Sequence, residues 1–208
     1  MKNSLVEIYN SFAETYDENR GLFDMTEVFQ SFYSQLDTEK GNLLDLGCGA
    51  GESFTKFFTD LGWNATGVDF SQKMLEMAKK YIPGMEAICA DMREVEFSEN
   101  HFDAITSIYS LFHVPSVDHE GIFRNWYRWL KPDGKALFTY ATKEYTGLEE
   151  FDGYKEFLEE KLFYSHITPI KLYTNLEKVG FEILATDYRT IGDEIFLWIT
   201  INKPSNIK

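Results

Sequence analysis

The sequence predicts a doubly wound α/β fold, in which an open and mostly parallel sheet carries helices on both faces. From residue 42 onward, short apolar runs alternate with longer amphipathic segments, the order typical of parallel sheets. The last two apolar runs are separated only by Ile191-Gly192-Asp193, which is too short for a parallel crossover, so they predict an antiparallel hairpin. With 208 residues and a hydrophobic share of 44%, we expect a single domain, 1–208, with one core.

The N-terminal region, 1–38, is expected to be helical. In "SLVEIYNSFAETYDENR", apolar and aromatic residues recur every three or four positions, which places them on one helix face. A second amphipathic segment, "MTEVFQSFYSQL", follows Gly21. Two helices are therefore predicted ahead of the sheet.

Five strand-like runs lie in the region 42–142: "NLLDLG", "NATGVDF", "MEAICAD", "FDAITSIYS" and "KALFTYAT". Helices are predicted after the first, second and fourth of these runs, and Ser71 can cap the second helix. The last of these helices is expected to reach Lys131, with "KPDG" as a turn before the fifth strand.

The region 144–167 fits neither the strand pattern nor the helix pattern. It is aromatic and acidic, and we expect it to be an insertion that caps the strand ends, within a helical and aromatic cap. The region 168–203 returns to the main pattern with the closing helix "IKLYTNLEKVGF" and the predicted hairpin.

Charge and cysteine content exclude several classes of partner. A net charge of −14 disfavours nucleic acid and anionic membrane surfaces as partners. The two cysteines, Cys48 and Cys89, are too few for a disulfide framework or a metal-ligand pattern, so no metal is expected and a reducing, cytoplasmic location is the simplest interpretation. The N-terminal residues carry no signal-peptide pattern, and no apolar run approaches the ~20 residues of a membrane span.

The stretch "LLDLGCGAGES" carries the strongest indication of a ligand. Glycines at every second position let the chain turn sharply from strand to helix and let a ligand approach the backbone, at the edge where open parallel sheets bind nucleotides. A dinucleotide fingerprint would need glycine where Glu52 stands. Asp45 and Glu52 would also repel a diphosphate, with roughly 1 kcal/mol between unit charges at ~4 Å in water and more in a closed site. A ligand with an ammonium or sulfonium group would be attracted.

Two more carboxylates follow at strand ends. Asp69 ends the second run and can accept hydrogen bonds from both ribose hydroxyls, or it can simply cap the next helix. Asp91 ends the third run, where its carboxylate can accept from an exocyclic adenine amine and the Met92 N–H can serve a ring nitrogen. Phe70 and Met74 would supply apolar faces for the ring.

These motifs together resemble the class I S-adenosylmethionine-dependent methyltransferases, in particular the UbiE-like, methyltransferase-domain branch that acts on small molecules. The resemblance runs from about residue 42 to residue 142 through "LLDLGCGAG", "GVDFS", "ADMRE", "FDAITSIYSLFHV" and "LKPDGKALF", and "TPIKLYTNLEKVGFEIL" extends it. It implies a Rossmann-like, seven-stranded sheet whose last strand is antiparallel, with an N-terminal helical lid. It also implies S-adenosylmethionine as cofactor and S-adenosylhomocysteine as product.

The resemblance implies a set of cofactor contacts. Asp45 and the turn through Gly47, Cys48 and Gly49 would hold the methionine end, and Ser107 would line it. In the leading helix, Tyr16 and Arg20 would close over the carboxylate, unless Arg20 instead pairs with a neighbouring acid on the surface. The cofactor-binding residues expected are Tyr16, Arg20, Asp45, Gly47, Cys48, Gly49, Asp69, Phe70, Met74, Asp91, Met92 and Ser107.

Methyl transfer from a sulfonium needs positioning more than a strong nucleophile, which suits a sequence without a Ser-His-Asp set. His113 and Tyr109, past the fourth run, are the catalytic candidates; His113 is either a general base or a structural histidine. We expect a small-molecule acceptor, no nucleic acid or membrane partner, and a monomer or homodimer. The alternatives are an NAD(P)-dependent oxidoreductase and a non-catalytic S-adenosylmethionine-binding protein.

Overall fold

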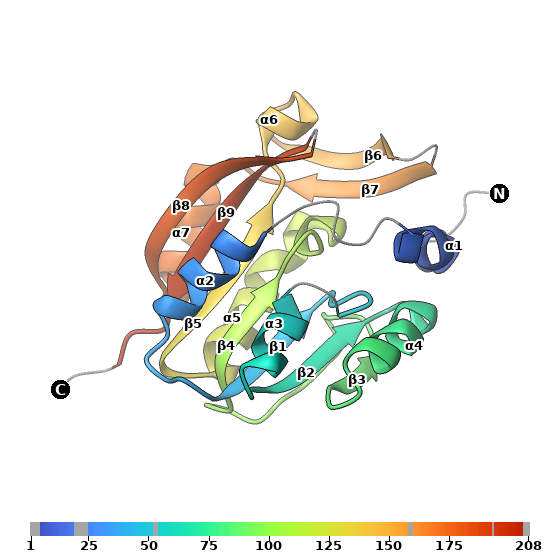
Figure 1. Ribbon diagram of the computed structural model, residues 1–208. Helices are drawn as coiled ribbons and strands as arrows, with labels where there is room; N and C mark the ends of the chain where they lie inside the picture. Colours follow the sequence, from blue (N-terminus) through green and yellow to red (C-terminus); the bar gives the residue numbers. More distant parts are fainter. Residues whose placement is uncertain (1–4, 19–24, 52–53, 158–159, 193, 206–208) are drawn as a thin grey trace.

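A seven-stranded sheet in the order β3-β2-β1-β4-β5-β9-β8 forms the centre of the molecule (Figure 1). The computed structural model describes residues 5–18, 25–51, 54–157, 160–192 and 194–205. The sheet strands are β1 (Asn42–Leu46), β2 (Asn64–Asp69), β3 (Glu86–Cys89), β4 (Phe102–Ser107), β5 (Leu130–Tyr140), β8 (Glu182–Ile191) and β9 (Glu194–Asn202). β9 pairs antiparallel with both β5 and β8, and the other pairs are parallel. This confirms the predicted sheet with its antiparallel C-terminal strand.

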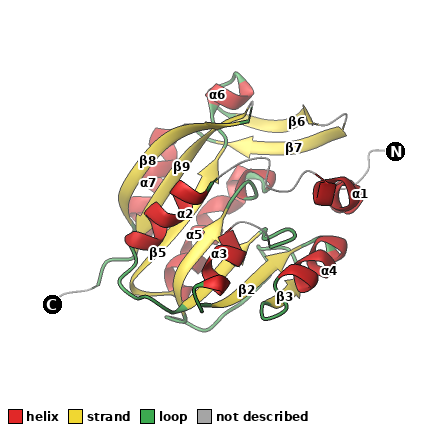
Figure 2. Cartoon of the chain, in the orientation of Figure 1, coloured by secondary structure: helices red, strands yellow, loops and turns green. Residues whose placement is uncertain are grey.

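Helices cover both faces of the sheet (Figure 2). On one face, α2 (Thr26–Ser34), α3 (Phe54–Asp60) and α4 (Gln72–Tyr81) bury their apolar side chains in one core cluster. On the other face, α5 (His119–Trp129) and α7 (Pro169–Val179) bury theirs in a second cluster. The connection between β1 and β2 leads to one side of β1, and β4 lies on the other, so the strand order reverses at β1 and β4. In such sheets the crevice at this reversal is the usual ligand site.

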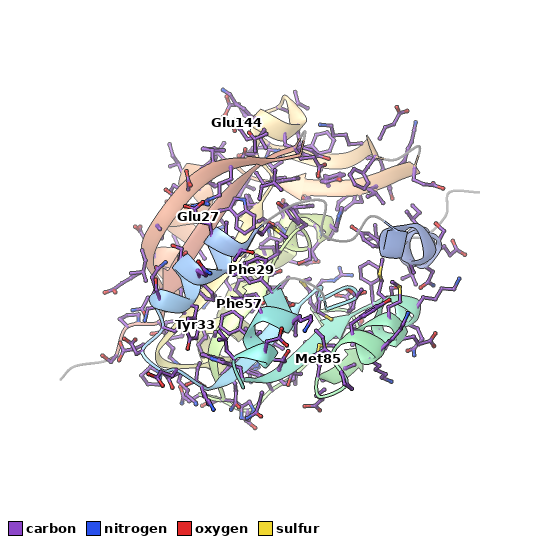
Figure 3. The ribbon with its side chains drawn as sticks, viewed as in Figure 1. Glu27, Phe29, Tyr33, Phe57, Met85 and Glu144 are labelled. Atoms are coloured by element: carbon purple, nitrogen blue, oxygen red, sulfur yellow. The ribbon has the colours of Figure 1, made fainter. Side chains whose placement is uncertain are left out.

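Aromatic side chains fix α2 against α3. Figure 3 shows Phe29 and Tyr33 of α2 beside Phe57 of α3. The ring centroids of Phe29 and Tyr33 lie 5.7 Å and 6.1 Å from that of Phe57, within the range of favourable aromatic pairs. The three- and four-residue spacing of aromatics in these segments therefore marks packing between the two helices.

The "KPDG" stretch is part of β5, which corrects the predicted turn. α5 ends at Trp129, and β5 begins at once with Leu130. Asp133 takes a left-handed backbone conformation (φ 62°), and the pairing of β5 with β4 shifts register in this region. The C-terminal segment stabilises the irregular strand, because Asp133 N–H donates to the Lys203 carbonyl at 2.7 Å and Lys203 N–H donates to the Gly134 carbonyl at 2.9 Å.

The cap after β5 is mainly a β-hairpin, whereas the sequence suggested a helical cap. A short helix α6 (Lys143–Thr146) leads into β6 (Phe151–Phe157), which pairs antiparallel with β7 (Glu160–His166). Half-buried and exposed positions alternate along β6, so its acidic side chains, at exposed positions, point away from the half-buried face.

The remaining elements lie around the strand tips. α1 (Leu5–Glu18) packs against α4 and β7, and the short 3₁₀ helices η1 (Leu111–His113) and η2 (Ser116–Asp118) follow β4 (Figure 1). None of the helices in the described part of the chain is both long and apolar enough to cross a membrane.

Candidate functional site

The glycine turn lies at the carboxyl end of β1, at the strand reversal. Gly47, Gly49 and Gly51 all have positive φ (76°, 52° and 73°), a conformation that disfavours side chains. A Cβ on Gly47 would lie 2.2 Å from the Ser110 Cβ, whereas a Cβ on Gly49 would meet no atom of the described residues within 4 Å. The turn is thus packed tightly on its β4 side and open above Gly49, where a ligand can approach the backbone.

Asp69 ties this turn to the start of α4. One carboxylate oxygen accepts from the Gly49 N–H at 2.9 Å, and the other accepts from the Ser71 N–H at 2.8 Å. Burial raises the pKa of Asp69, and these two backbone hydrogen bonds oppose that rise. Each oxygen keeps a lone pair for one further donor, which is the arrangement that two adjacent hydroxyls require.

Asp45 is buried inside the sheet at the end of β1. Its carboxylate accepts hydrogen bonds from the Thr55 hydroxyl and, at 2.8 Å, from the Thr106 hydroxyl, so it joins β1, α3 and β4. Burial raises its pKa to about 6, and the nearby charge of Asp69 adds to that rise. The structure places two threonine hydroxyls on this carboxylate, and its contact with a methionine end stays a prediction.

Cys48 is a core residue whose backbone belongs to the turn. Its N–H donates to the Val68 carbonyl at 3.1 Å, and burial raises the pKa of its thiol. The thiol packs against Gly67, because a Cβ there would lie 2.8 Å from the Cys48 Sγ. Cys89, in contrast, is exposed.

Asp91 and Met92 follow β3 at the same edge of the sheet. Met92 is buried, and the Asp91 carboxylate is held by the Arg93 guanidinium, with Arg93 Nη2 at 2.6 Å from Asp91 Oδ2. Phe70 lies edge-on to the ring of Tyr9, with the centroids 5.5 Å apart. Met74 is buried in a small cluster with alanines of α1 and the glycine turn. Whether these residues surround an adenine stays a prediction.

The loop after β4 lies on the other side of the glycine turn from β2 and β3. Ser110 Oγ donates to the Leu46 carbonyl at 2.7 Å and lies 2.7 Å from the buried Ser107 Oγ, so Ser107 donates to Ser110. Tyr109 has a left-handed backbone (φ 53°), and its N–H donates to Thr139 Oγ1 at 2.6 Å. A non-glycine residue in this conformation at a strand tip is typical of functional sites.

His113 joins three segments that are far apart in the sequence. Its Nδ1 lies 2.7 Å from the Phe163 carbonyl oxygen in β7, and its Nε2 lies 2.9 Å from the Tyr9 hydroxyl in α1. Burial lowers the pKa of His113 to about 4, although the bond to the Phe163 carbonyl opposes that shift. A carbonyl only accepts, so Nδ1 carries the proton and Nε2 accepts from Tyr9. His113 is therefore neutral near pH 7, with a basic nitrogen facing the lid.

α1 makes a second polar contact with the core, at the start of α4. Ser71 Oγ donates to the Asn10 side-chain oxygen at 2.7 Å, and Ala13 is buried against the glycine turn and α4. The side chain of Tyr16 and the whole of Arg20 lie outside the described residues, so their predicted contacts stay predictions. Asn10, Ser110 and Thr139 were not predicted from the sequence. Of these three residues, only Ser110 lies beside predicted site residues in the sequence, close to Ser107 and Tyr109.

The cap supplies an aromatic and acidic wall. The Tyr145 hydroxyl lies 3.0 Å from Glu194 Oε1 and 3.1 Å from the Tyr164 hydroxyl. Burial raises the pKa of Glu194. The Tyr164 ring lies 4.8 Å from the His113 ring, centroid to centroid, so the wall adjoins the histidine. Among the described residues, no group of three histidine, cysteine or acidic side chains is arranged to hold a metal ion.

The strand order and the glycine turn define a Rossmann-like α/β protein, and the turn lies at the tips of β1 and β4, where such sheets usually bind nucleotides. Residues 44–138 match the family model described as a methyltransferase domain. Over 186 residues the chain is 31% identical to phosphoethanolamine N-methyltransferase 1 of Triticum aestivum, covering 86% of this chain and 35% of that protein. Over 142 residues it is 30% identical to demethylmenaquinone methyltransferase of Lactobacillus johnsonii. That match covers 62% of this chain and 57% of the relative.

A solved structure, a putative S-adenosylmethionine-dependent methyltransferase from Listeria monocytogenes, shares the fold. Its TM-score is 0.72 at 19% identity, with 88% of this chain and 100% of that chain covered. Residues 44–138 therefore form a methyltransferase domain, and the fold is that of the class I S-adenosylmethionine-dependent methyltransferases, as the motifs indicated. It spans about a third of the wheat relative's length.

Proposed function

We propose that this chain is an enzyme that transfers a methyl group from S-adenosylmethionine to a small-molecule acceptor and releases S-adenosylhomocysteine. The observation that carries the proposal is the pair of buried carboxylates, Asp45 and Asp69, beside the glycine turn. Burial raises the pKa of both, so their charged forms gain from a nearby cation and lose from a nearby diphosphate. A sulfonium cofactor therefore suits this crevice better than a dinucleotide.

The residues at the strand tips fit the parts of this cofactor. The two free lone pairs of Asp69 match the two ribose hydroxyls. The adenine would lie between Asp91, Met92 and the apolar residues Phe70 and Met74. The methionine end would lie over Gly49, where the backbone is open, with Ser107 on the far wall.

When bound, the cofactor supplies a methyl group that the positive sulfur has already activated. The chain's own contribution is to hold the acceptor in line and to remove its proton where the acceptor must lose one. His113 Nε2 is unprotonated at neutral pH and bonds to the Tyr9 hydroxyl, so it would accept that proton directly or through Tyr9. Tyr109 would shape the space beside the reacting methyl.

The acceptor that the aromatic and acidic residues of the cap favour is a small amine. The wheat relative is named for transfer to the nitrogen of phosphoethanolamine, and the carboxylate of Glu194 among tyrosine hydroxyls suits a group that carries positive charge before it loses a proton. The strongly acidic surface argues against nucleic acid as acceptor. We further infer a cytoplasmic protein that works as a monomer or homodimer.

Calorimetry with S-adenosylhomocysteine and with NAD tests the cofactor, and transfer of labelled methyl from S-adenosylmethionine to a pool of small amines tests the reaction. We expect S-adenosylhomocysteine to bind and NAD not to bind, with label appearing in an amine. Binding of NAD alone would assign an oxidoreductase. Binding of S-adenosylhomocysteine without transfer to any small molecule of a cell extract would assign a protein that binds the cofactor without turnover.

A further inference from the structure

His119 and Tyr140 are two buried polar side chains that the proposed reaction does not use. His119 begins α5 and Tyr140 ends β5, and their exposed fractions are 1% and 0%. His119 Nδ1 lies 3.1 Å from the Tyr140 hydroxyl, and His119 Nε2 lies 2.9 Å from the Val114 carbonyl oxygen. The Tyr140 hydroxyl oxygen also accepts a hydrogen bond from the Ile167 N–H at 3.2 Å. The pair therefore joins the loop after β4 to the end of β7.

The donors and acceptors of this group have a fixed order. A carbonyl only accepts, so His119 Nε2 carries the proton and donates to Val114. Nδ1 of the neutral ring then accepts from the Tyr140 hydroxyl, whose oxygen accepts in turn from the Ile167 N–H. Burial lowers the pKa of His119 to about 4, so the ring stays neutral near pH 7 and keeps this order. An apolar side chain in place of either residue would leave buried polar groups of the others without partners.

Both of the joined segments hold His113. Val114 follows His113 directly in the chain, so the bond to its carbonyl fixes the loop that carries the imidazole. Phe163 lies in β7, and its carbonyl accepts from His113 Nδ1 at 2.7 Å. Ile167 directly follows the same strand. The bonds of the buried pair therefore set the position of the imidazole relative to the carbonyl that holds its Nδ1 proton.

A further contact joins the same two segments between these points. The Ser116 N–H donates to Ser165 Oγ at 2.8 Å, and Ser165 Oγ donates to Asp152 Oδ1 of β6 at 2.8 Å. The loop after β4 thus contacts β7 and its end at positions 163, 165 and 167. Because the loop runs beside the strand, a shift at one end of this contact line moves the histidine at the other end.

We propose that His119 and Tyr140 are positioning residues for His113: they hold its loop against β7, so that Nδ1 keeps its proton on the Phe163 carbonyl and Nε2 stays unprotonated toward Tyr9. The partner of one histidine nitrogen decides which nitrogen is basic. This inference rests on the proposed function, because it gives His113 the proton that the acceptor loses. The buried pair acts through His113 and need not touch the cofactor or the acceptor.

The test compares the wild type with H119L, H119Q, Y140F and W63F. H119L removes both ring nitrogens, whereas the amide of H119Q can still offer an N–H to the Val114 carbonyl. Y140F removes only the hydroxyl. Trp63 is the matched control, because it is buried and its indole N–H donates to the Glu39 carbonyl at 2.9 Å. It directly precedes β2, at the end of that strand away from the glycine turn.

Two quantities are measured for each protein. Long-range proton–nitrogen NMR spectra report which nitrogen of His113 carries the proton, and the rate of methyl transfer to the amine that takes up label is measured beside the dissociation constant of S-adenosylhomocysteine. We expect H119L and Y140F to lose the single Nδ1–H form of His113. Their transfer rate should fall about tenfold or more, with the affinity for S-adenosylhomocysteine within about twofold of the wild type. H119Q should recover the wild-type spectrum, and W63F should keep it.

The spectra decide the inference. A wild-type His113 spectrum in both H119L and Y140F would overturn it and leave the pair a role in stability alone. A change in W63F as large as theirs would also overturn it, because the effect would then come from lost stability. If H119L does not fold, Y140F alone decides. A wild type that transfers no label would overturn the proposed function, whereas the spectra would still show whether the pair positions His113, so the two failures are separate observations.

Discussion

His113 is the residue whose surroundings say most about the chemistry of the site. Its pKa of about 4 keeps Nε2 unprotonated throughout the neutral range, where it accepts a hydrogen bond from the Tyr9 hydroxyl. We expect H113Q to lower turnover by about 10²-fold or more while leaving the affinity for S-adenosylhomocysteine within about twofold of the wild type. Single-turnover rates and calorimetry on both proteins measure these two quantities.

The pH dependence of turnover checks the same residue independently. The folded pKa lies below the ordinary value for histidine, so the rate of the wild type should hold as pH falls through 6.5 and decline only on approach to about pH 4 to 5. An acid limb centred near 6.5 would contradict this expectation and would assign the base to another, more exposed group. A full rate in H113Q at every pH would leave His113 a purely structural role.

Gly47 is fixed by geometry on two counts, its positive φ and the contact with Ser110. A Cβ cannot enter without moving the Ser110 side chain, which holds the end of β1. We expect G47A to lower the free energy of unfolding by about 2 kcal/mol or more, as overpacking and backbone strain add. The matched control is G84A, because a Cβ there meets nothing within 4 Å. Urea unfolding should show G84A within about 0.5 kcal/mol of the wild type; equal losses in the two variants would contradict the expectation.

At the scale of elements, α1 is joined to the core at two points that lie on different sides of the site. Asn10 bonds to Ser71 at the start of α4, and Tyr9 bonds to His113. We expect N10A to loosen only the first of these and so to speed the release of S-adenosylhomocysteine several-fold, since α1 packs on the turn that we propose to hold the cofactor. Stopped-flow dissociation measures the rate, and hydrogen exchange over residues 5–18 reports the loosening.

Val6→Ala provides the control for this helix, because Val6 is one of its exposed residues. We expect V6A to release the ligand at the wild-type rate. If N10A and V6A behave alike, the Asn10 contact does not hold the lid, and α1 would be fixed by its apolar packing alone.

The elements that sequence patterns predicted best are those with strong local periodicity. β1, β2 and β4 are short buried runs, and the structure has them where the pattern indicated. The cap hairpin was missed because the aromatic residues of β6 and β7 lie on both faces of the hairpin and so give no clear two-residue period, within a segment of high helix-forming acid content. The start of β5 was missed because its partner, Lys203, is about seventy residues away in the sequence.

Site residues, too, could be predicted where the local sequence pattern was clear. The positions of the acids at strand tips could be predicted because each lies at the end of a recognisable strand, as Asp45 and Asp69 do. Their partners could not, since the hydrogen bond between Tyr9 and His113 joins residues 104 positions apart. Local sequence therefore indicates which residues reach the crevice, and the tertiary fold decides which of them meet.

At the scale of the whole molecule, buried ionisable groups give the stability of the fold a pH dependence with opposing parts. Burial lowers the pKa of His113 and of His119 to about 4. The unfolded chain binds protons at these histidines below about pH 6.5 while the folded chain does not, so stability falls as pH drops from 6.5 toward 4. Asp45 has the opposite sign, because its folded pKa is about 6 against 3.8 for an ordinary aspartate. The folded chain binds that proton first, so Asp45 lowers stability as pH rises from 4 through 6.

The ionised Asp45 carboxylate should therefore cost the fold stability at neutral pH, up to about 3 kcal/mol from a shift of roughly two pKa units. We expect D45N to unfold at higher urea concentration than the wild type at pH 8, with a gain of about 1–2 kcal/mol, because the amide can still hydrogen-bond with Thr55 and Thr106. Near pH 4, where the wild-type carboxyl is protonated, the gain should vanish.

The same variant should bind S-adenosylhomocysteine more weakly at pH 8, since it removes one of the two acids beside the glycine turn. A stability difference that is the same at both pH values would show that folding does not shift the pKa of Asp45, and burial would then make only the charge of Asp69 dependent on a nearby cation.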